Sequence, residues 1–79
     1  MDFTIVKKMQ VGGHVYKLLR ANFYRNHYLI IAQSKREFAC GSVCASIDAA
    51  EELFSQIAQS ETEPYTLMDI LRDFEMQTV

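Results

Sequence analysis

The sequence has no long apolar run, and this absence limits the kinds of protein that it can encode. No stretch approaches the roughly 18 consecutive apolar residues that a membrane-spanning helix requires, so we expect no association with a membrane. No apolar segment with a small-residue cleavage site follows the opening Met1-Asp2-Phe3, so we expect no secretory signal. Cysteine is scarce as well, with two in 79 residues, which is typical of a protein in the reducing cytoplasm.

The residue patterns that mark common enzymes are also missing. Gly12-Gly13 is too short for a phosphate-binding loop, and no serine lies in a nucleophile elbow. Cys40 and Cys44 would lie about 13 Å apart on an extended strand, too far for a disulfide unless a turn brings them closer. With His14 and His27 they are zinc-ligand residue types, but their order matches no standard zinc finger. We therefore predict a non-enzymatic protein with no catalytic residues, cofactor or metal. The cysteines are expected to be buried or half-buried free thiols, and a disulfide or a zinc site is the weaker alternative.

Each half of the chain is poor in charge of one sign. Residues 1–40 hold seven basic and two acidic side chains, for a net charge of +5. Residues 41–79 hold eight acidic side chains and a single basic one, Arg72, for a net charge of −7. Such a division affects association and local electric fields, and it does not determine the fold. A basic first half suits an acidic partner.

The first half of the sequence shows the period of two that is typical of β-strands. Its most apolar stretch, residues 28–32, is apolar on both faces, which predicts a central strand covered on both sides. Gly12-Gly13 is the clearest turn signal, because glycine adopts the positive φ of tight hairpins without a Cβ penalty. No connection is long enough for a crossover helix, so an antiparallel meander is expected. The predicted strands cover residues 3–8, 14–21, 27–33 and 36–43.

From Ser46 onward the apolar period changes to 3.6, which predicts two amphipathic helices. The first covers residues 47–59, with the hydroxyl of Ser46 as its N-cap. The second covers residues 66–75, although a start at Pro64 is also compatible with proline in a first helical turn. The sequence therefore predicts one α+β domain over residues 1–79, with an antiparallel sheet and both helices packed on one of its faces.

Two helices can cover only one face of this sheet, and the other face still carries apolar side chains. An exposed apolar face usually marks an interface. We therefore expect a small protein-interaction module that self-associates as a homodimer or binds another protein. The tip at residues 23–25 has the aromatic and arginine composition of an interface anchor. The candidate interaction residues are Tyr16, Leu18, Phe23, Tyr24, Arg25 and Tyr28.

Nucleic-acid binding is the alternative function, and the sequence favours it less. Aromatic side chains lie among the basic residues of the first half, where they could stack on bases beside phosphate contacts. Against this, the second half is acidic and the calculated pI is ≈ 5.5. Basic residues that share one exposed face with aromatic residues would favour nucleic acid, and scattered ones would favour protein contacts. The residues that decide are Lys7, Lys17, Arg20, Arg25 and Arg36.

Several short pieces of the sequence form a pattern that covers most of the chain from Tyr16 onward. They are Tyr16-Lys17-Leu18-Leu19, Tyr28-Leu29-Ile30, Ser46-x-Asp48 at a helix start, and Pro64-x-x-Leu67-x-Asp69-Ile70-Leu71-x-Asp73-Phe74. In these pieces the chain resembles an uncharacterised family of short bacterial proteins, mostly from Gram-positive anaerobes. It departs from that family in the turn at residues 23–25 and in its two cysteines. The resemblance implies a small cytoplasmic α+β protein, and it implies no functional residues because the family has no assigned activity.

Overall fold

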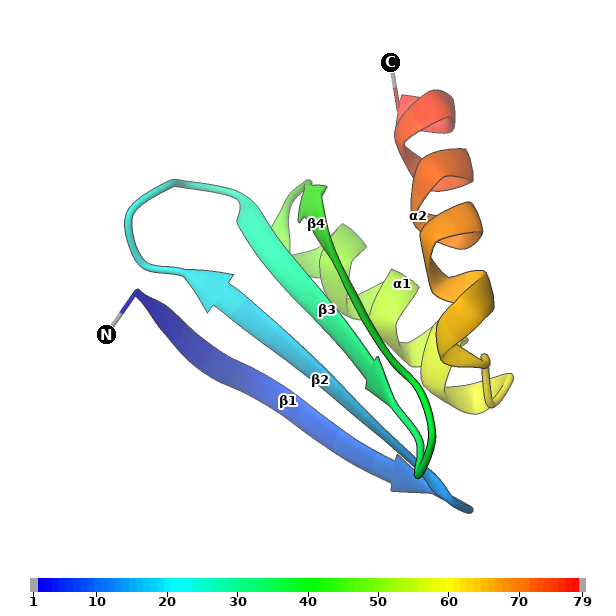
Figure 1. Ribbon diagram of the computed structural model, residues 1–79. Helices are drawn as coiled ribbons and strands as arrows, with labels where there is room; N and C mark the ends of the chain where they lie inside the picture. The colour runs from blue at the N-terminus through cyan, green and yellow to red at the C-terminus, as the bar shows by residue number, and fades with distance from the viewer. Residues whose placement is uncertain (1, 79) are drawn as a thin grey trace.

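The computed structural model describes residues 2–78, and the side chains of residues 2–74. Its elements are the strands β1 (Phe3–Val11), β2 (His14–Ala21), β3 (His27–Gln33) and β4 (Phe38–Cys44), followed by the helices α1 (Ile47–Gln59) and α2 (Pro64–Thr78) (Figure 1). The predicted α+β class, with four strands and then two helices, is confirmed. Met1 and Val79, the ends of the predicted domain, lie outside the described residues.

The four strands form one antiparallel meander in the order β1-β2-β3-β4, as the short connections predict. β1 and β2 pair as far as Val11 and His14, and Gly12 takes a φ of 59° in the turn between them. The predicted end of the first strand at residue 8 is therefore wrong. A bulge between Ile5 and Lys7 shifts the register, and this irregularity breaks the alternation on which the prediction depends.

One face of the sheet packs against both helices and forms the core. In β3 the residues on this face are Tyr28, Ile30 and Ala32, and all three are buried. The other buried side chains of the core are Tyr16, Leu18, Val43, Ala50, Leu53, Phe54, Ile57, Ala58, Leu67 and Leu71. Leu29 and Ile31 of β3 point to the opposite face, where they are half-buried and have no helix above them. The chain thus covers this strand on one side only, and not on both as its composition predicts.

The start and the end of α1 follow from local hydrogen bonds. The hydroxyl of Ser46 accepts from the backbone N–H of Ala49 at 3.3 Å, so the predicted N-cap is confirmed. After the helix, Glu61 takes a φ of 50°, and the N–H of Thr62 donates to the carbonyl of Ile57 at 3.2 Å. This left-handed residue with its backward hydrogen bond is a Schellman ending, which normally uses glycine. It turns the chain back toward the sheet.

Two predicted element boundaries shift for local reasons. α2 begins at Pro64, as the alternative start predicts, because the fixed φ and missing N–H of proline suit a first helical position. It continues three residues beyond the predicted end at 75. β4 begins at Phe38 because a turn precedes it, in which the N–H of Ser34 donates to the carbonyl of Glu37 at 2.8 Å. The predicted starts at residues 66 and 36 are therefore wrong by two residues each.

α2 packs closely on β4 at a glycine. Gly41 is buried, and a Cβ atom at this position would collide with the side chain of Leu71 and would lie 3.1 Å from Sδ of Met68. The missing side chain therefore lets α2 approach the strand directly. α1 lies behind the strands in Figure 1 and α2 lies beside β4, so the two helices occupy one side of the sheet.

Candidate interaction surface

The main candidate site is the face of the sheet that the helices leave uncovered, here called the open face (Figure 1). Strand residues alternate between the two faces of a sheet, and the register aligns those of neighbouring strands in rows. The outward-pointing residues include Ile5, Lys8, Gln10, Val15, Lys17, Leu19, His27, Leu29, Ile31, Gln33, Phe38, Cys40, Ser42 and Cys44. The open face therefore combines apolar side chains with lysine, glutamine and thiol groups.

The half of the open face nearer to the β2–β3 loop is apolar. The register places Ile5 opposite Leu19, and Leu19 opposite Leu29, so an apolar row crosses three strands. Ile5 is 56% exposed, and the two leucines are half-buried. These three side chains define what we call the apolar half. Its surface has the chemistry of a core layer that has no second layer against it.

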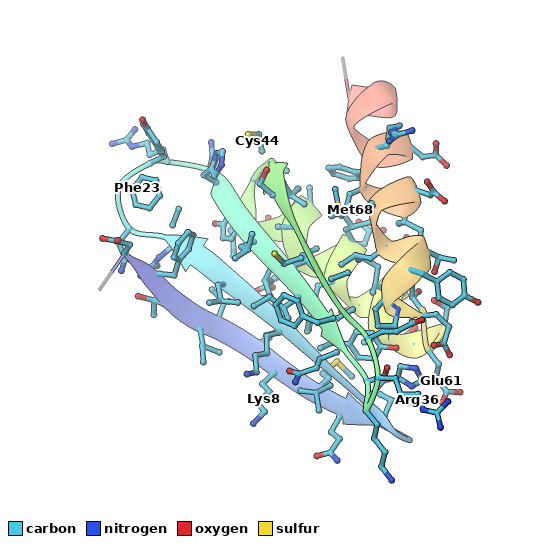
Figure 2. All side chains as sticks on the ribbon, in the orientation of Figure 1. Lys8, Phe23, Arg36, Cys44, Glu61 and Met68 are labelled. Carbon is cyan, nitrogen blue, oxygen red and sulfur yellow. The ribbon has the colours of Figure 1, made fainter. Side chains whose placement is uncertain are left out.

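The β2–β3 loop extends the apolar half with aromatic side chains (Figure 2). The ring of Phe23 meets the ring of Phe3 edge-on, with centroids 5.6 Å apart, and its centroid lies 4.9 Å from that of Tyr24. Phe23 is 54% exposed and Tyr24 is 65% exposed. Asn26 takes a φ of 53°, and its carbonyl accepts from the N–H of Ala45 at 2.9 Å, which fixes the loop to the end of β4. Two large aromatic rings are thus presented to solvent from an anchored loop.

The six candidate interaction residues divide between the core and the surface. Tyr16, Leu18 and Tyr28 are buried against the helices, so they are not accessible to a partner. The other three are exposed neighbours in the β2–β3 loop, namely Phe23, Tyr24 and Arg25. The structure thus corrects the assignment for β2 and β3. Both faces of these strands carry apolar residues, so the sequence pattern does not reveal which set faces the helices.

Tyr16 joins β2 to the loop between the helices. Its hydroxyl donates to the carbonyl of Thr62 at 2.8 Å within the core. The ring of His14 stacks on that of Tyr16 with centroids 6.0 Å apart, and His14 Nε2 lies 3.1 Å from a carboxylate oxygen of Glu63. Burial raises the pKa of Tyr16, and the negative charges of Glu63 and Glu61 raise it further. The cluster therefore stabilises a neutral tyrosine and fixes the helices to the sheet.

Both cysteines are free and exposed, because they point to the open face and not to the core. The expectation of buried or half-buried thiols is therefore wrong. Cys44 Sγ lies 3.2 Å from Nδ1 of His27, its register partner on β3. His14, the other histidine, lies in the Tyr16 cluster near the opposite end of the sheet. Among the described residues, no three histidine, cysteine or acidic side chains gather in a way that could hold a metal ion.

The basic residues that decide between the two candidate functions are scattered. Lys7 lies at the β1 bulge and Lys17 on the open face. Arg20 lies near the end of β2, Arg25 in the β2–β3 loop and Arg36 in the β3–β4 turn. Sequence reasoning missed Lys8, which the register places opposite Lys17 on the open face. Figure 2 shows Lys8 on β1 and Phe23 on the loop at the far end of the sheet. The pairing of Lys8 depends on the bulge, so the sequence gives no direct signal for it.

Comparison of the chain with protein-family models, curated protein sequences and solved structures finds no significant match. The resemblance to a bacterial family stays a prediction. Within the described residues, no helix is both long enough and apolar enough to cross a membrane. Function therefore has to be inferred from the chemistry of the open face and of the β2–β3 loop.

Proposed function

We propose that the protein is a small non-enzymatic protein-interaction module that self-associates through the apolar half of its open face. The observation that supports the proposal is the row of Ile5, Leu19 and Leu29 on a face without helical cover. The exposed rings of Phe23 and Tyr24 continue this row. The proposed occupant is a second copy of the chain, and the proposed compartment is the cytoplasm, where exposed free thiols stay reduced.

The energetics of a small chain favour a second copy. A domain of 79 residues builds only a modest core, and association is a common way to enlarge it. Burying one large aliphatic side chain stabilises a complex by about 1.5–3 kcal/mol. In a symmetric homodimer the same patch is buried on both copies. A short apolar row on each chain therefore contributes strongly to the stability of the dimer. The exposed aromatic rings add contact area at low entropic cost.

The charges of the open face favour a staggered pair. Lys8 and Lys17 lie on the side of the apolar row that is nearer to the β1–β2 turn, in the next outward-facing row. Two copies that join by their apolar halves and point in opposite directions therefore keep their lysines apart. The sheet edges are less suitable contacts, because β1 has Lys7 and a bulge at its edge while α2 packs along β4. The face is accordingly the better surface for a second copy.

Sedimentation equilibrium of the wild type and of Ile5→Ser tests the proposal. The wild type is expected to exceed its monomer mass of 9.1 kDa at micromolar concentration. Ile5→Ser should weaken the dimer by about tenfold or more, because each dimer loses two isoleucine side chains. Since Ile5 is 56% exposed in the single chain, the substitution leaves the core intact.

Met68→Ser is the matched control for Ile5→Ser. Met68 is 49% exposed on α2 and its Sδ lies beside Gly41 of β4, so this substitution removes an apolar side chain from the helical layer and leaves the open face unchanged. It should leave the dimer unchanged. A wild type that stays at 9.1 kDa throughout, or an equal loss of dimer in both variants, would contradict the proposal.

Nucleic-acid binding is the second candidate function, because Lys8 and Lys17 share the open face with Phe38, which is 62% exposed. The other basic residues are scattered and the helical half is acidic, so protein contacts are the better supported function. Binding of a single-stranded oligonucleotide at low salt would favour this candidate, and an absence of binding there would remove it.

A further inference from the structure

The half of the open face nearer to the β1–β2 turn contains a hollow of ≈ 650 Å³, which we call the lysine hollow. Lys8 of β1, Lys17 of β2 and Lys35 of the β3–β4 turn line it. Its neutral polar lining includes the side chains of Gln10, Gln33 and Ser34. None of the described carboxylates is among the lining residues. Three basic residues from three separate segments thus line one depression.

Two of these lysines are placed where their charges repel each other. The register sets Lys8 directly opposite Lys17 on neighbouring strands, and like charges at such positions are destabilising. Within the described residues, the one ion pair shorter than 4.0 Å joins His14 and Glu63, so none of the three lysines forms an ion pair of that length with a described carboxylate. Lys17 is half-buried, which reduces the screening of its charge by solvent. An anion bound in the hollow would offset this repulsion.

The lining groups fit the oxygen atoms of a phosphate. A lysine ammonium group is a compact point charge, and several of them can contact separate oxygens of a tetrahedral anion. The amides of Gln10 and Gln33 and the hydroxyl of Ser34 are neutral donors for further oxygens. The lining contains no aromatic ring on which a nucleic-acid base could stack. The volume falls in the range of small-molecule sites, about 300–1,000 Å³.

We propose that the lysine hollow binds the phosphate group of a small phosphorylated molecule. The proposal goes beyond self-association, because the hollow is lined by residues nearer to the β1–β2 turn, none of which belongs to the apolar half. An anion site and a dimer interface can therefore be present together or separately, and measurements of anion affinity and of solution mass distinguish their failures.

Thermal unfolding and NMR titration with inorganic pyrophosphate test this site, with sodium chloride at matched ionic strength as the reference. Pyrophosphate should raise the unfolding temperature of the wild type above the chloride value and should shift the amide signals of residues around Lys8, Lys17 and Lys35. Lys17→Gln should weaken pyrophosphate binding by about tenfold, since one charged donor is lost. In dilute chloride the same variant should unfold at a higher temperature than the wild type, because the repulsion from Lys8 is gone.

Lys7→Gln is the matched control for Lys17→Gln, because Lys7 carries the same charge and lies beside Lys8 on β1 but does not line the hollow. It should bind pyrophosphate like the wild type. Lys35→Gln, in an exposed turn, repeats the test if the change at Lys17 disturbs folding. Parallel titrations with orthophosphate and with ribose 5-phosphate show whether a free or an esterified phosphate is preferred, and tighter binding of either one supports the site.

Three results would overturn the proposal. The first is a response to pyrophosphate no larger than that to chloride at the same ionic strength. The second is an equal loss of affinity in Lys7→Gln and Lys17→Gln, which would indicate general charge attraction and no defined site. The third is Lys17-dependent binding of a single-stranded oligonucleotide without binding of any small phosphate, which would make the hollow part of a nucleic-acid surface.

Discussion

Tyr16 links the sheet to the helices by one hydrogen bond in the core. Its hydroxyl donates to the carbonyl of Thr62 in the turn after α1, where Glu61 holds the left-handed conformation. The carbonyl faces a buried environment, so it depends on this donor. Tyr16 therefore has two structural roles. Its ring fills the core, and its hydroxyl donates the hydrogen bond that stabilises the turn between the two helices.

Tyr16→Phe should lower the free energy of unfolding by about 1–3 kcal/mol, because it leaves the Thr62 carbonyl without its donor. Chemical denaturation at neutral pH measures this loss. Tyr65→Phe is the control, since Tyr65 is 69% exposed and lies outside the core. An equal effect of the two substitutions would contradict the assigned role of the Tyr16 hydroxyl.

The pH dependence of stability gives a second readout for Tyr16→Phe. The pKa of Tyr16 lies above its ordinary value of 10.0, because of burial first and then of Glu63 and Glu61. In the unfolded chain the tyrosine ionises at the ordinary value, so alkaline pH favours unfolding. The contribution of Tyr16 is complete below about pH 10 and is lost as pH rises through the raised pKa. Tyr16→Phe should remove this part of the alkaline decline, and Tyr65→Phe should leave it unchanged.

At the scale of elements, the contact between β4 and α2 depends on Gly41. The strand is composed of small residues at this point, and Leu71 and Met68 of α2 occupy the space that a side chain at Gly41 would need. Close contact of this kind positions α2 over the edge strand, and thereby leaves the opposite face of the sheet as the uncovered one.

Gly41→Ala should lower the free energy of unfolding by about 1–3 kcal/mol, because the added methyl group overpacks the contact with Leu71. Gly13→Ala is the matched control, since a Cβ atom at Gly13 would meet nothing within 4 Å. It should change stability by less than about 0.5 kcal/mol. Thermal or denaturant unfolding of the two variants measures this difference. Equal stability of both would show that α2 does not pack on β4 in this way.

Periodicity was sufficient to predict the elements, because alternation in the strands and the helical stripe after Ser46 both reflect burial. It failed where the backbone departs from regular geometry. The bulge between Ile5 and Lys7 changes which β1 residues face outward, so neither the exposure of Ile5 nor the pairing of Lys8 with Lys17 follows from alternation. The inward face of β2 and β3 could not be predicted either, because each of their faces carries large apolar residues. The candidate surfaces therefore depend on register, which a single sequence defines poorly.

At the scale of the whole molecule, the chain has two unlike sides. The helical side carries the acidic residues of the second half of the sequence, and the open face carries an apolar half and a basic half. We propose different ligands for the two halves of the open face, a second copy of the chain for the first and a phosphate for the second. This division explains why the charge asymmetry of the sequence alone could not distinguish protein contacts from nucleic-acid contacts.

The central claim is that the apolar half of the open face is buried against a second copy. Methyl NMR over a dilution series from millimolar to low micromolar concentration tests it most directly. The methyl signals of Ile5, Leu19 and Leu29 should shift with concentration, whereas the methyl signal of Met68, which is 49% exposed on α2, should stay constant. Signals of Ile5, Leu19 and Leu29 that do not change over the whole series, or a shift confined to Met68, would contradict the claim.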